Sequence, residues 1–129
     1  FEFIISSEDV ELKKPNPFPY LKKADVFILS SLYEGLPNVL LEAMALKKFI
    51  ISSNCPTGPK EILQNGKLGE LFKNNNYNEL KKKIINFHKS PNKAKSKIDL
   101  FQKNLKRFDF NKRCEDYFKI VLRYIENEK

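Results

Sequence analysis

The sequence has 129 residues, a length that suits one domain with a single hydrophobic core. Its 24 lysine and arginine residues outnumber its 16 aspartate and glutamate residues, which gives a formal charge of +8. It has neither an apolar run of about 18 residues nor the pattern of a secretory leader, so we expect no membrane-spanning segment and no leader. The two cysteines, Cys55 and Cys114, are far apart and form no metal-binding motif. We therefore expect free thiols in a reducing compartment and no metal site.

The beginning of the chain gives weak structural signals. Residues 1–7 are apolar and fit either a strand or the end of a helix, and residues 9–12 fit a short strand. Three prolines within residues 13–19 predict an irregular loop, because proline fixes φ and lacks a backbone donor. A short helix over residues 20–24 would then lead into the first core strand.

The strongest pattern follows. Two short apolar runs, at residues 26–29 and 49–51, flank a longer apolar segment over residues 37–46 that has the length and composition of a helix. A strand, a helix and a strand of this size predict a βαβ unit, in which the strands are parallel and the crossover is right-handed. Ligands of such sheets bind at the carboxyl ends of the strands. The expected ligand-facing loop is therefore residues 31–36.

The start of this helix has the features of an anion site. Pro37 fits the first turn, and the other backbone donors from Gly35 to Leu40 have no carbonyl partners of their own. Together with the helix dipole they favour an anion such as phosphate. Glu42 is the only charge among apolar residues, so if buried it needs a cation, donor hydroxyls such as those of a ribose, or a raised pKa. The helix pattern equally allows Glu42 to pair with a lysine or to reach solvent through a narrow exposed strip.

The chain after the second strand alternates short elements with turns. Residues 54–59 are rich in turn-forming residues and lie at the same carboxyl edge as Glu34. A helix over residues 59–64 should stop at Gly66, a C-terminal cap signal, and residues 69–72 should form a short strand.

The remainder is predicted to be helical. Asn76 with Glu79 three residues later indicates a helix start, Pro91 starts a second helix, and Asp109 or Asn111 caps a third. Their apolar stripes are interpreted as core rather than as a cofactor site. These stripes comprise Leu80, Ile84, Phe87 and His88, then Ile98, Phe101 and Leu105, and finally Cys114, Phe118, Val121 and Ile125.

The segment from Lys73 to Arg113 is strongly basic, with thirteen basic residues against three acidic ones. Such a segment is read as a solvated face, as a surface for an acidic membrane, or as a nucleic-acid surface. No nucleic-acid motif is legible, so we expect no nucleic-acid partner and retain the first two readings.

The run from Tyr33 to Ala43 contains Glu34 and Glu42 with seven residues between them. It resembles the two-glutamate signature of retaining GT-B glycosyltransferases of the family 4 type. The resemblance covers roughly residues 9 to 90, including residues 16–25 and 55–63. It implies an α/β fold: a Rossmann-like parallel sheet with flanking helices, as the incomplete C-terminal half of a GT-B fold with a helical C-terminus. Residues 1–129 would then be one partial nucleotide-sugar-binding domain.

The resemblance also implies roles for residues of this sequence. The catalytic residue would be Glu34, which approaches the transferred sugar, and Glu42 would hold the ribose hydroxyls of the nucleotide. The diphosphate would lie on the backbone N–H groups of Gly35, Leu36, Asn38 and Val39. The implied reaction transfers a sugar, with retention, from a nucleotide diphosphate sugar to an acceptor hydroxyl. The implied setting is bacterial surface polysaccharide or lipid-linked oligosaccharide synthesis, with no metal and no cofactor beyond the donor substrate.

The sequence also departs from this family. The acceptor-binding N-terminal domain is not in it, and neither are the basic residues usual near the start of the donor domain. We therefore expect the chain alone to be inactive and to need that domain or a partner chain. The expected location is the cytoplasm, at the inner face of the cytoplasmic membrane. The alternatives are a truncated non-catalytic remnant and a basic module for membrane or nucleic acid. The sugar, base, acceptor and linkage stay open.

Overall fold

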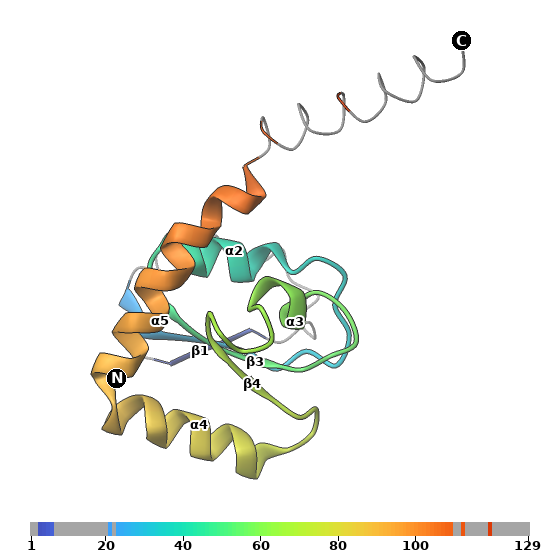
Figure 1. Cartoon of the computed structure of the whole chain (residues 1–129). Coiled ribbons are helices and arrows are strands. Elements are labelled where there is room, and N and C mark those ends of the chain that lie inside the picture. The colour runs from blue at the N-terminus through green and yellow to red at the C-terminus, as the bar shows by residue number, and fades with distance from the viewer. Residues whose placement is uncertain (1–2, 7–20, 22, 110–111, 113–118, 120–129) are drawn as a thin grey trace.

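The computed structural model describes residues 3–6, 21, 23–109, 112 and 119. Its centre is a four-stranded sheet in the order β1-β2-β3-β4, and all neighbouring strands are parallel (Figure 1). The strands are β1 (Phe3–Ser6), β2 (Val26–Leu29), β3 (Phe49–Ser53) and β4 (Glu70–Phe72). The predicted parallel α/β sheet is therefore confirmed. Pairing with β2 also shows that residues 3–6 within the apolar start of the chain form a strand. The predicted strand at 9–12 and the predicted loop at 13–19 lie outside the described residues.

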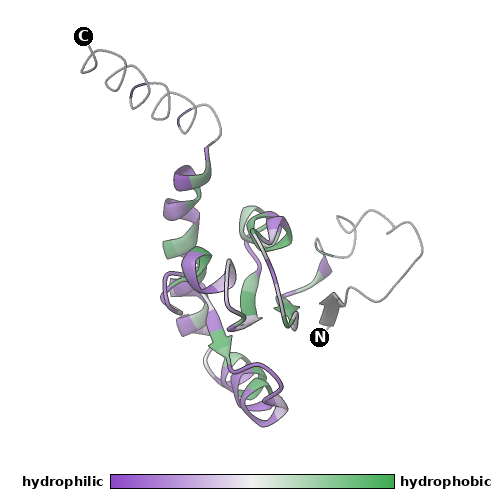
Figure 2. Cartoon of the chain, turned by 90° about the vertical axis from the view of Figure 1, so that its right-hand side faces the viewer, coloured by the Kyte–Doolittle hydropathy of each residue, from purple (hydrophilic) through white to green (hydrophobic). Residues whose placement is uncertain are grey.

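The two central strands are buried along their whole length, because helices cover both faces of the sheet. Successive side chains of a strand point to opposite faces. Phe27 and Ile50 accordingly pack in a core with Met44 and Phe101, on the face covered by the helix between β2 and β3. The other face forms a second core of Val26, Ile28, Phe49, Ile51, Phe72 and Ala94, with Leu80, Ile84, Phe87 and Ile98 against it. Figure 2 shows hydrophobic colouring along the strands and alternating colours along the helices.

The predicted βαβ unit is formed by β2, α2 (Asn38–Ala45) and β3. Helix α2 buries Leu40, Ala43 and Met44. The following helix, α3 (Pro59–Ile62), is shorter than predicted, and a turn with positive φ at Asn65 and Gly66 follows it. That turn agrees with the predicted stop signal.

Helices α4 (Tyr77–Lys89) and α5 (Pro91–Asn104) follow β4, and η1 (Leu105–Phe108) extends α5. The two predicted helix starts are confirmed. The side chain of Asn76 accepts a hydrogen bond of 3.0 Å from the backbone N–H of Glu79, and α5 begins with Pro91. Of the two predicted caps of the last helix, Asp109 accepts a hydrogen bond of 3.0 Å from the Lys112 N–H. Asn111 and the predicted apolar stripe of that helix lie outside the described residues.

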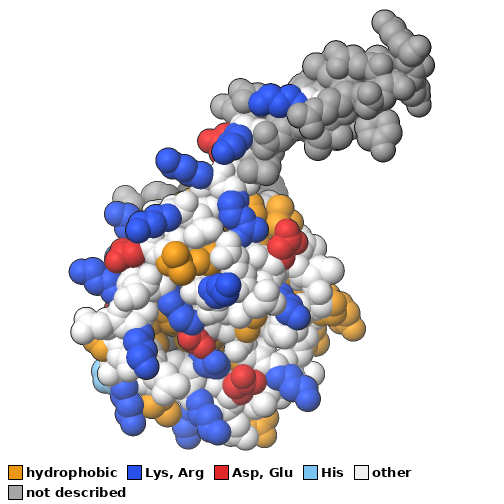
Figure 3. Space-filling model, in the orientation of Figure 1, with side chains coloured by type: hydrophobic (Ala, Val, Ile, Leu, Met, Phe, Trp, Pro, Cys, Tyr) orange, Lys and Arg blue, Asp and Glu red, His pale blue; other side chains and the backbone are white. Residues whose placement is uncertain are grey.

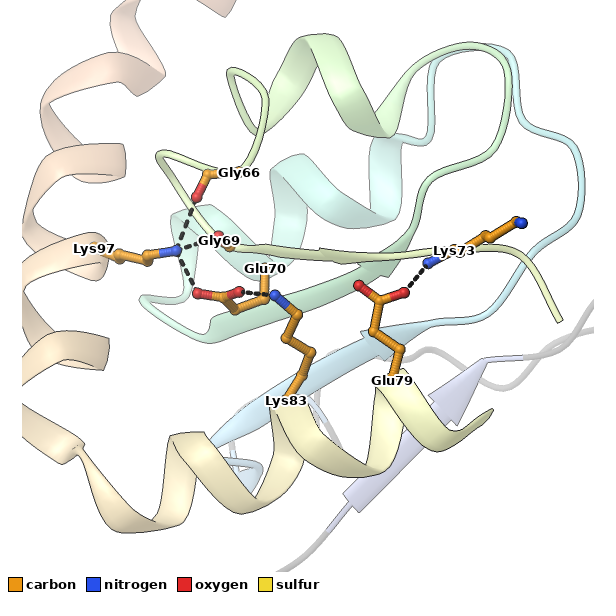
Figure 4. Close-up of polar contacts among 7 residues, drawn as sticks. All are labelled: Gly66, Gly69, Glu70, Lys73, Glu79, Lys83 and Lys97. Atoms are coloured by element: carbon orange, nitrogen blue, oxygen red, sulfur yellow. Dashed lines mark hydrogen bonds and ion pairs between the residues drawn. The ribbon is translucent and has the colours of Figure 1, made fainter. Parts of the chain in front are cut away.

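One polar cluster ties β4 to both C-terminal helices (Figure 4). The Glu70 carboxylate pairs with the ammonium groups of Lys83, at 2.7 Å, and Lys97, at 2.5 Å. Lys97 also donates to the carbonyl oxygens of Gly66, at 2.8 Å, and Gly69, at 2.7 Å. Burial by itself raises the pKa of the Glu70 carboxyl, but the hydrogen bonds and charges of the two lysines outweigh it and leave the pKa lowered.

We expect Glu70→Gln to destabilise the fold at pH 7 by about 1–2 kcal/mol, because two partly buried ammonium groups lose their counter-charge. A carboxyl with a lowered folded-state pKa contributes stability above the unfolded pKa, and this contribution disappears as the pH falls through the folded value. The difference between the wild type and the variant should therefore shrink on acidification below the ordinary value of 4.5. Urea unfolding at several pH values measures this. The exposed Glu61→Gln is the matched control, and a pH-independent difference would contradict the argument.

Candidate functional site

Two loops lie side by side at the carboxyl edge of the sheet: residues 30–37 after β2 and residues 54–58 after β3 (Figure 1). Side chains from other segments hold the backbone of the first loop. The Ser53 hydroxyl donates to the carbonyl oxygen of Ser31 at 2.5 Å, and the Thr57 hydroxyl donates to that of Glu34. The Asn74 amide, which follows β4, donates to the carbonyl oxygen of Leu32 at 3.3 Å. The loop is therefore anchored by the end of β3, by the loop that follows β3 and by the segment that follows β4.

Gly58 allows the two loops to meet backbone to backbone. Its φ of +86° is a conformation that side-chain-bearing residues rarely adopt. A Cβ atom at this position would lie 2.5 Å from Cδ of Pro37 and would also overlap the carbonyl oxygen of Gly35. The second loop thus packs directly beneath the turn that leads into α2.

Cys55 is part of the second loop and is 1% exposed. Burial raises the pKa of its thiol, and the nearby charge of Glu34 raises it further. The predicted free thiol is confirmed for this residue. A buried, protonated thiol is a packing group rather than a nucleophile.

The beginning of α2 differs in two details from the sequence prediction. Pro37 precedes the helix as its N-cap instead of standing in its first turn, and the backbone N–H of Leu40 already donates to the Pro37 carbonyl oxygen at 2.9 Å. Leu40 is therefore removed from the expected free donors. No side chain caps this end and no acidic residue stands in its first turn, so the helix dipole there faces no built-in counter-charge.

The two glutamates lie on either side of this helix start in sequence. Glu34 is half-buried in the anchored loop, whereas Glu42 is exposed on α2. Asn38, Glu42 and Ala45 form the exposed strip of the helix, so Glu42 stands about 6 Å along the axis from Asn38 on the same face. Burial therefore does not force Glu42 to find a partner, and the alternative prediction of a narrow solvent-facing strip is correct.

The structure brings together most residues that the sequence singled out. Gly35 and Leu36 are exposed in the first loop, and Asn38 and half-buried Val39 begin α2 directly after it. Sequence reasoning missed the supporting residues Ser53 and Asn74 and assigned no direct role to residues 57–59. Their only sequence signal was their position just after a strand or at its end. Large apolar side chains also surround the site: Leu32 is 48% exposed, Tyr33 is 77% exposed and Leu36 is 59% exposed.

In the described part of the chain, no three residues among histidine, cysteine, aspartate and glutamate are grouped so that they could hold a metal ion. The described helices include none that is long and apolar enough to cross a membrane. Figure 3 shows lysine and arginine side chains spread over one face with acidic side chains between them, which favours the solvated-face reading for that face.

A comparison with protein families matches residues 11–103, more than half of the chain, to the family described as glycosyl transferases group 1. The chain belongs to this family. An uncharacterized glycosyltransferase of Methanocaldococcus jannaschii is 54% identical over 48 residues, which are 37% of this chain and 12% of that protein.

Two further similarities cover more of this glycosyltransferase chain. The Campylobacter jejuni N-acetylgalactosamine-N,N'-diacetylbacillosaminyl-diphospho-undecaprenol 4-alpha-N-acetylgalactosaminyltransferase is 25% identical over 107 residues, which are 83% of this chain and 29% of that enzyme. The crystal structure of a glycosyltransferase from Rickettsia africae superposes with a TM-score of 0.70 at 23% identity, over 84% of this chain and 30% of that one. The fold is thus that of a GT-B-type glycosyltransferase, and the chain spans less than a third of these relatives.

Proposed function

We propose that this chain is the donor-binding part of a retaining glycosyltransferase of the family 4 type, which uses a nucleotide diphosphate sugar. One observation carries the proposal. In a member of a glycosyltransferase family, Glu34 and Glu42 bracket an uncapped helix start whose preceding loop is anchored at three points. Such a helix start favours an anion because its backbone donors lack partners and its dipole is positive there.

Each part of the donor has a place in this proposal. The diphosphate lies on the backbone N–H groups of Gly35, Leu36, Asn38 and Val39, while Pro37 shapes the turn because it has no N–H. The ribose hydroxyls donate to the carboxylate of Glu42, one turn along the exposed face of α2. The transferred sugar lies at Glu34, whose backbone carbonyl is held by Thr57.

The reaction breaks the bond between the anomeric carbon and the diphosphate and forms a bond from that carbon to the acceptor oxygen, with the same anomeric configuration. The diphosphate leaves with the electron pair of the broken bond and takes up the proton that the acceptor hydroxyl loses. The amides at the start of α2 stabilise the charge that develops on the leaving group. Glu34 positions the sugar and does not act as one of a glycosidase-like carboxylate pair. No cofactor beyond the donor is required.

The acceptor belongs to a part of the enzyme that this chain does not contain. The Campylobacter relative is named for transfer to a diphospho-undecaprenol-linked saccharide, which supports a lipid-linked or surface saccharide as acceptor. We therefore place the enzyme in the cytoplasm, peripheral at the inner face of the membrane, and expect the chain alone to be inactive. Catalysis then needs an acceptor-binding domain or a partner chain.

A titration of the isotopically labelled chain with UDP, GDP, UDP-N-acetylhexosamines and GDP-mannose tests donor binding by NMR. Chemical-shift changes centred on residues 34–42 are expected, and the preferred nucleotide base limits which donor substrates are possible. Glu42→Gln should weaken binding about tenfold, because charge-assisted hydrogen bonds to the ribose become neutral ones.

Asp99→Asn is the matched control, since it removes one exposed carboxylate from α5 and should leave the affinity unchanged. A folded chain that binds none of these nucleotides would contradict the proposal and favour a non-catalytic remnant. Equal affinity of the wild type and Glu42→Gln would remove Glu42 from the site.

A further inference from the structure

A separate cavity of about 290 Å³ lies between α4, α5 and the sheet. Phe49 and Glu70 belong to its lining and are the first residues of β3 and β4, so the cavity opens at the amino edge of the sheet. The proposed donor site lies at the opposite, carboxyl edge. The remaining lining residues are Lys83, Asn86, Phe87, Ser90, Lys93, Ala94 and Lys97.

The charges that line this cavity do not balance. Lys83, Lys93 and Lys97 face a single carboxylate, Glu70, so the lining carries a formal charge of +2. The lowered pKa keeps the Glu70 carboxyl ionised at neutral pH, so the formal charge of the lining stays at +2. An anion entering the cavity would therefore be attracted.

The hydrogen-bond donors identify which lysines are available to it. An ammonium group has three donors. Lys97 uses its three donors on the carbonyl oxygens of Gly66 and Gly69 and on the carboxylate of Glu70 (Figure 4). It therefore lines the cavity without a donor left for a ligand. Lys83 donates to Glu70 and has two further donors. Lys93 also lines the cavity and is exposed.

The uncharged walls suit the organic part of a phosphorylated molecule. Phe49 and Phe87 stack with ring centroids 5.0 Å apart and an interplanar angle of 20°. Ser90 also lines the cavity. It is both the C-cap of α4 and the N-cap of α5, and its hydroxyl makes no capping hydrogen bond to α5, so that hydroxyl adds a polar group to the lining. A lining that combines hydrogen-bond donors with aromatic rings is usual in small-molecule sites.

We propose that this cavity binds a small phosphomonoester, with its phosphate between Lys83 and Lys93 and its organic group against Phe87. The phosphomonoester is either a soluble metabolite or a lipid headgroup. The inference does not depend on the donor site at the other edge of the sheet, and nucleotide binding at residues 34–42 can succeed or fail independently of it.

The test uses the whole chain with phenyl phosphate and with inorganic phosphate, followed by NMR. Phenyl phosphate should shift the backbone amides of residues 86–94 and bind more tightly than inorganic phosphate. Lys83→Gln and Lys93→Gln should each raise its dissociation constant about tenfold, since each removes a charge-assisted hydrogen bond. The matched controls Lys82→Gln and Lys95→Gln remove exposed lysines of the same helices that do not line the cavity, and each should change the constant by less than about twofold.

Absence of shifts at residues 86–94, or equal weakening by all four substitutions, would overturn the proposal in favour of diffuse attraction to a basic surface. Because Lys93 is exposed, the Lys93→Gln variant should fold even if the loss of the Glu70–Lys83 pair perturbs Lys83→Gln. Sedimentation with phosphatidic acid vesicles then distinguishes a lipid headgroup from a soluble metabolite as the phosphomonoester that is bound. Vesicle binding that requires Lys83 and Lys93 identifies a lipid headgroup, whereas phenyl phosphate binding without vesicle binding identifies a soluble ester.

Discussion

Gly58→Ala is expected to destabilise the chain by about 3–5 kcal/mol and to abolish nucleotide binding in whatever fraction remains folded. Two costs add at this position. The first is the backbone conformation, because a φ of +86° strains a residue that bears a Cβ atom. The second is overlap, because that atom would lie 2.5 Å from Cδ of Pro37 and against the carbonyl oxygen of Gly35. The overlap can be relieved only by separating the loop that follows β3 from the loop that leads into α2.

Alanine substitutions at two other glycines distinguish the cost of the backbone conformation from the cost of the overlap. Gly66 has nearly the same φ, +87°, but its nearest potential contact is 3.9 Å away, so Gly66→Ala should cost only about 1–2 kcal/mol. Gly35 has ordinary φ and nothing within 4 Å of a built Cβ, so Gly35→Ala should stay within about 0.5 kcal/mol of the wild type. Urea unfolding of the three variants measures the difference. If Gly58→Ala were no less stable than Gly66→Ala, the packing of the two loops would not constrain the turn before α2.

Glu34→Gln is expected to lower the rate of sugar transfer about 100-fold to 1,000-fold in an enzyme that joins this chain to its acceptor-binding domain. Glu34 is proposed to position the sugar and not to hold the nucleotide, so the loss should appear mainly in kcat. The affinity for the free nucleoside diphosphate should stay within about twofold of the wild type, because the amide groups and Glu42 are unchanged.

Asp25→Asn is the control for this experiment. Asp25 is exposed and immediately precedes β2, so it lies at the amino edge of the sheet, away from the site. Steady-state kinetics with donor and acceptor varied separately distinguishes the two constants. An unchanged kcat in Glu34→Gln would show that another group positions the sugar, and a loss confined to the donor KM would give Glu34 a binding role.

Part of this fold could be predicted from the sequence, because it depends on local chemistry. The strands β2 and β3 are buried on both faces, and a strand in that environment is a short, continuous apolar run. The start of α4 follows from Asn76 and the start of α5 from Pro91, since each acts on backbone groups within three residues of itself. The positions of Glu34 and Glu42 around the start of α2 follow from the same local regularity.

Contacts between distant segments could not be predicted from local sequence features. The hydroxyl of Ser53 meets the carbonyl oxygen of Ser31, 22 residues earlier, and Asn74 meets that of Leu32 across 42 residues. Serine and asparagine at strand ends are ordinary turn residues, so nothing in their spacing identifies these partners. The same holds for Glu70, whose two lysine partners come from different helices.

The sequence alone therefore determined the parallel α/β architecture, the βαβ unit and the two glutamates at its helix start, because hydrophobic periodicity and capping act over a few residues. Only the tertiary structure decided three other matters. It showed the first apolar stretch to be a strand, through pairing with β2, and it showed Glu42 to be exposed rather than buried. It also placed Gly58 against Pro37, which fixes the turn before α2. Each of these depends on which segments pack together, and packing joins residues whose separation along the chain carries no local signal.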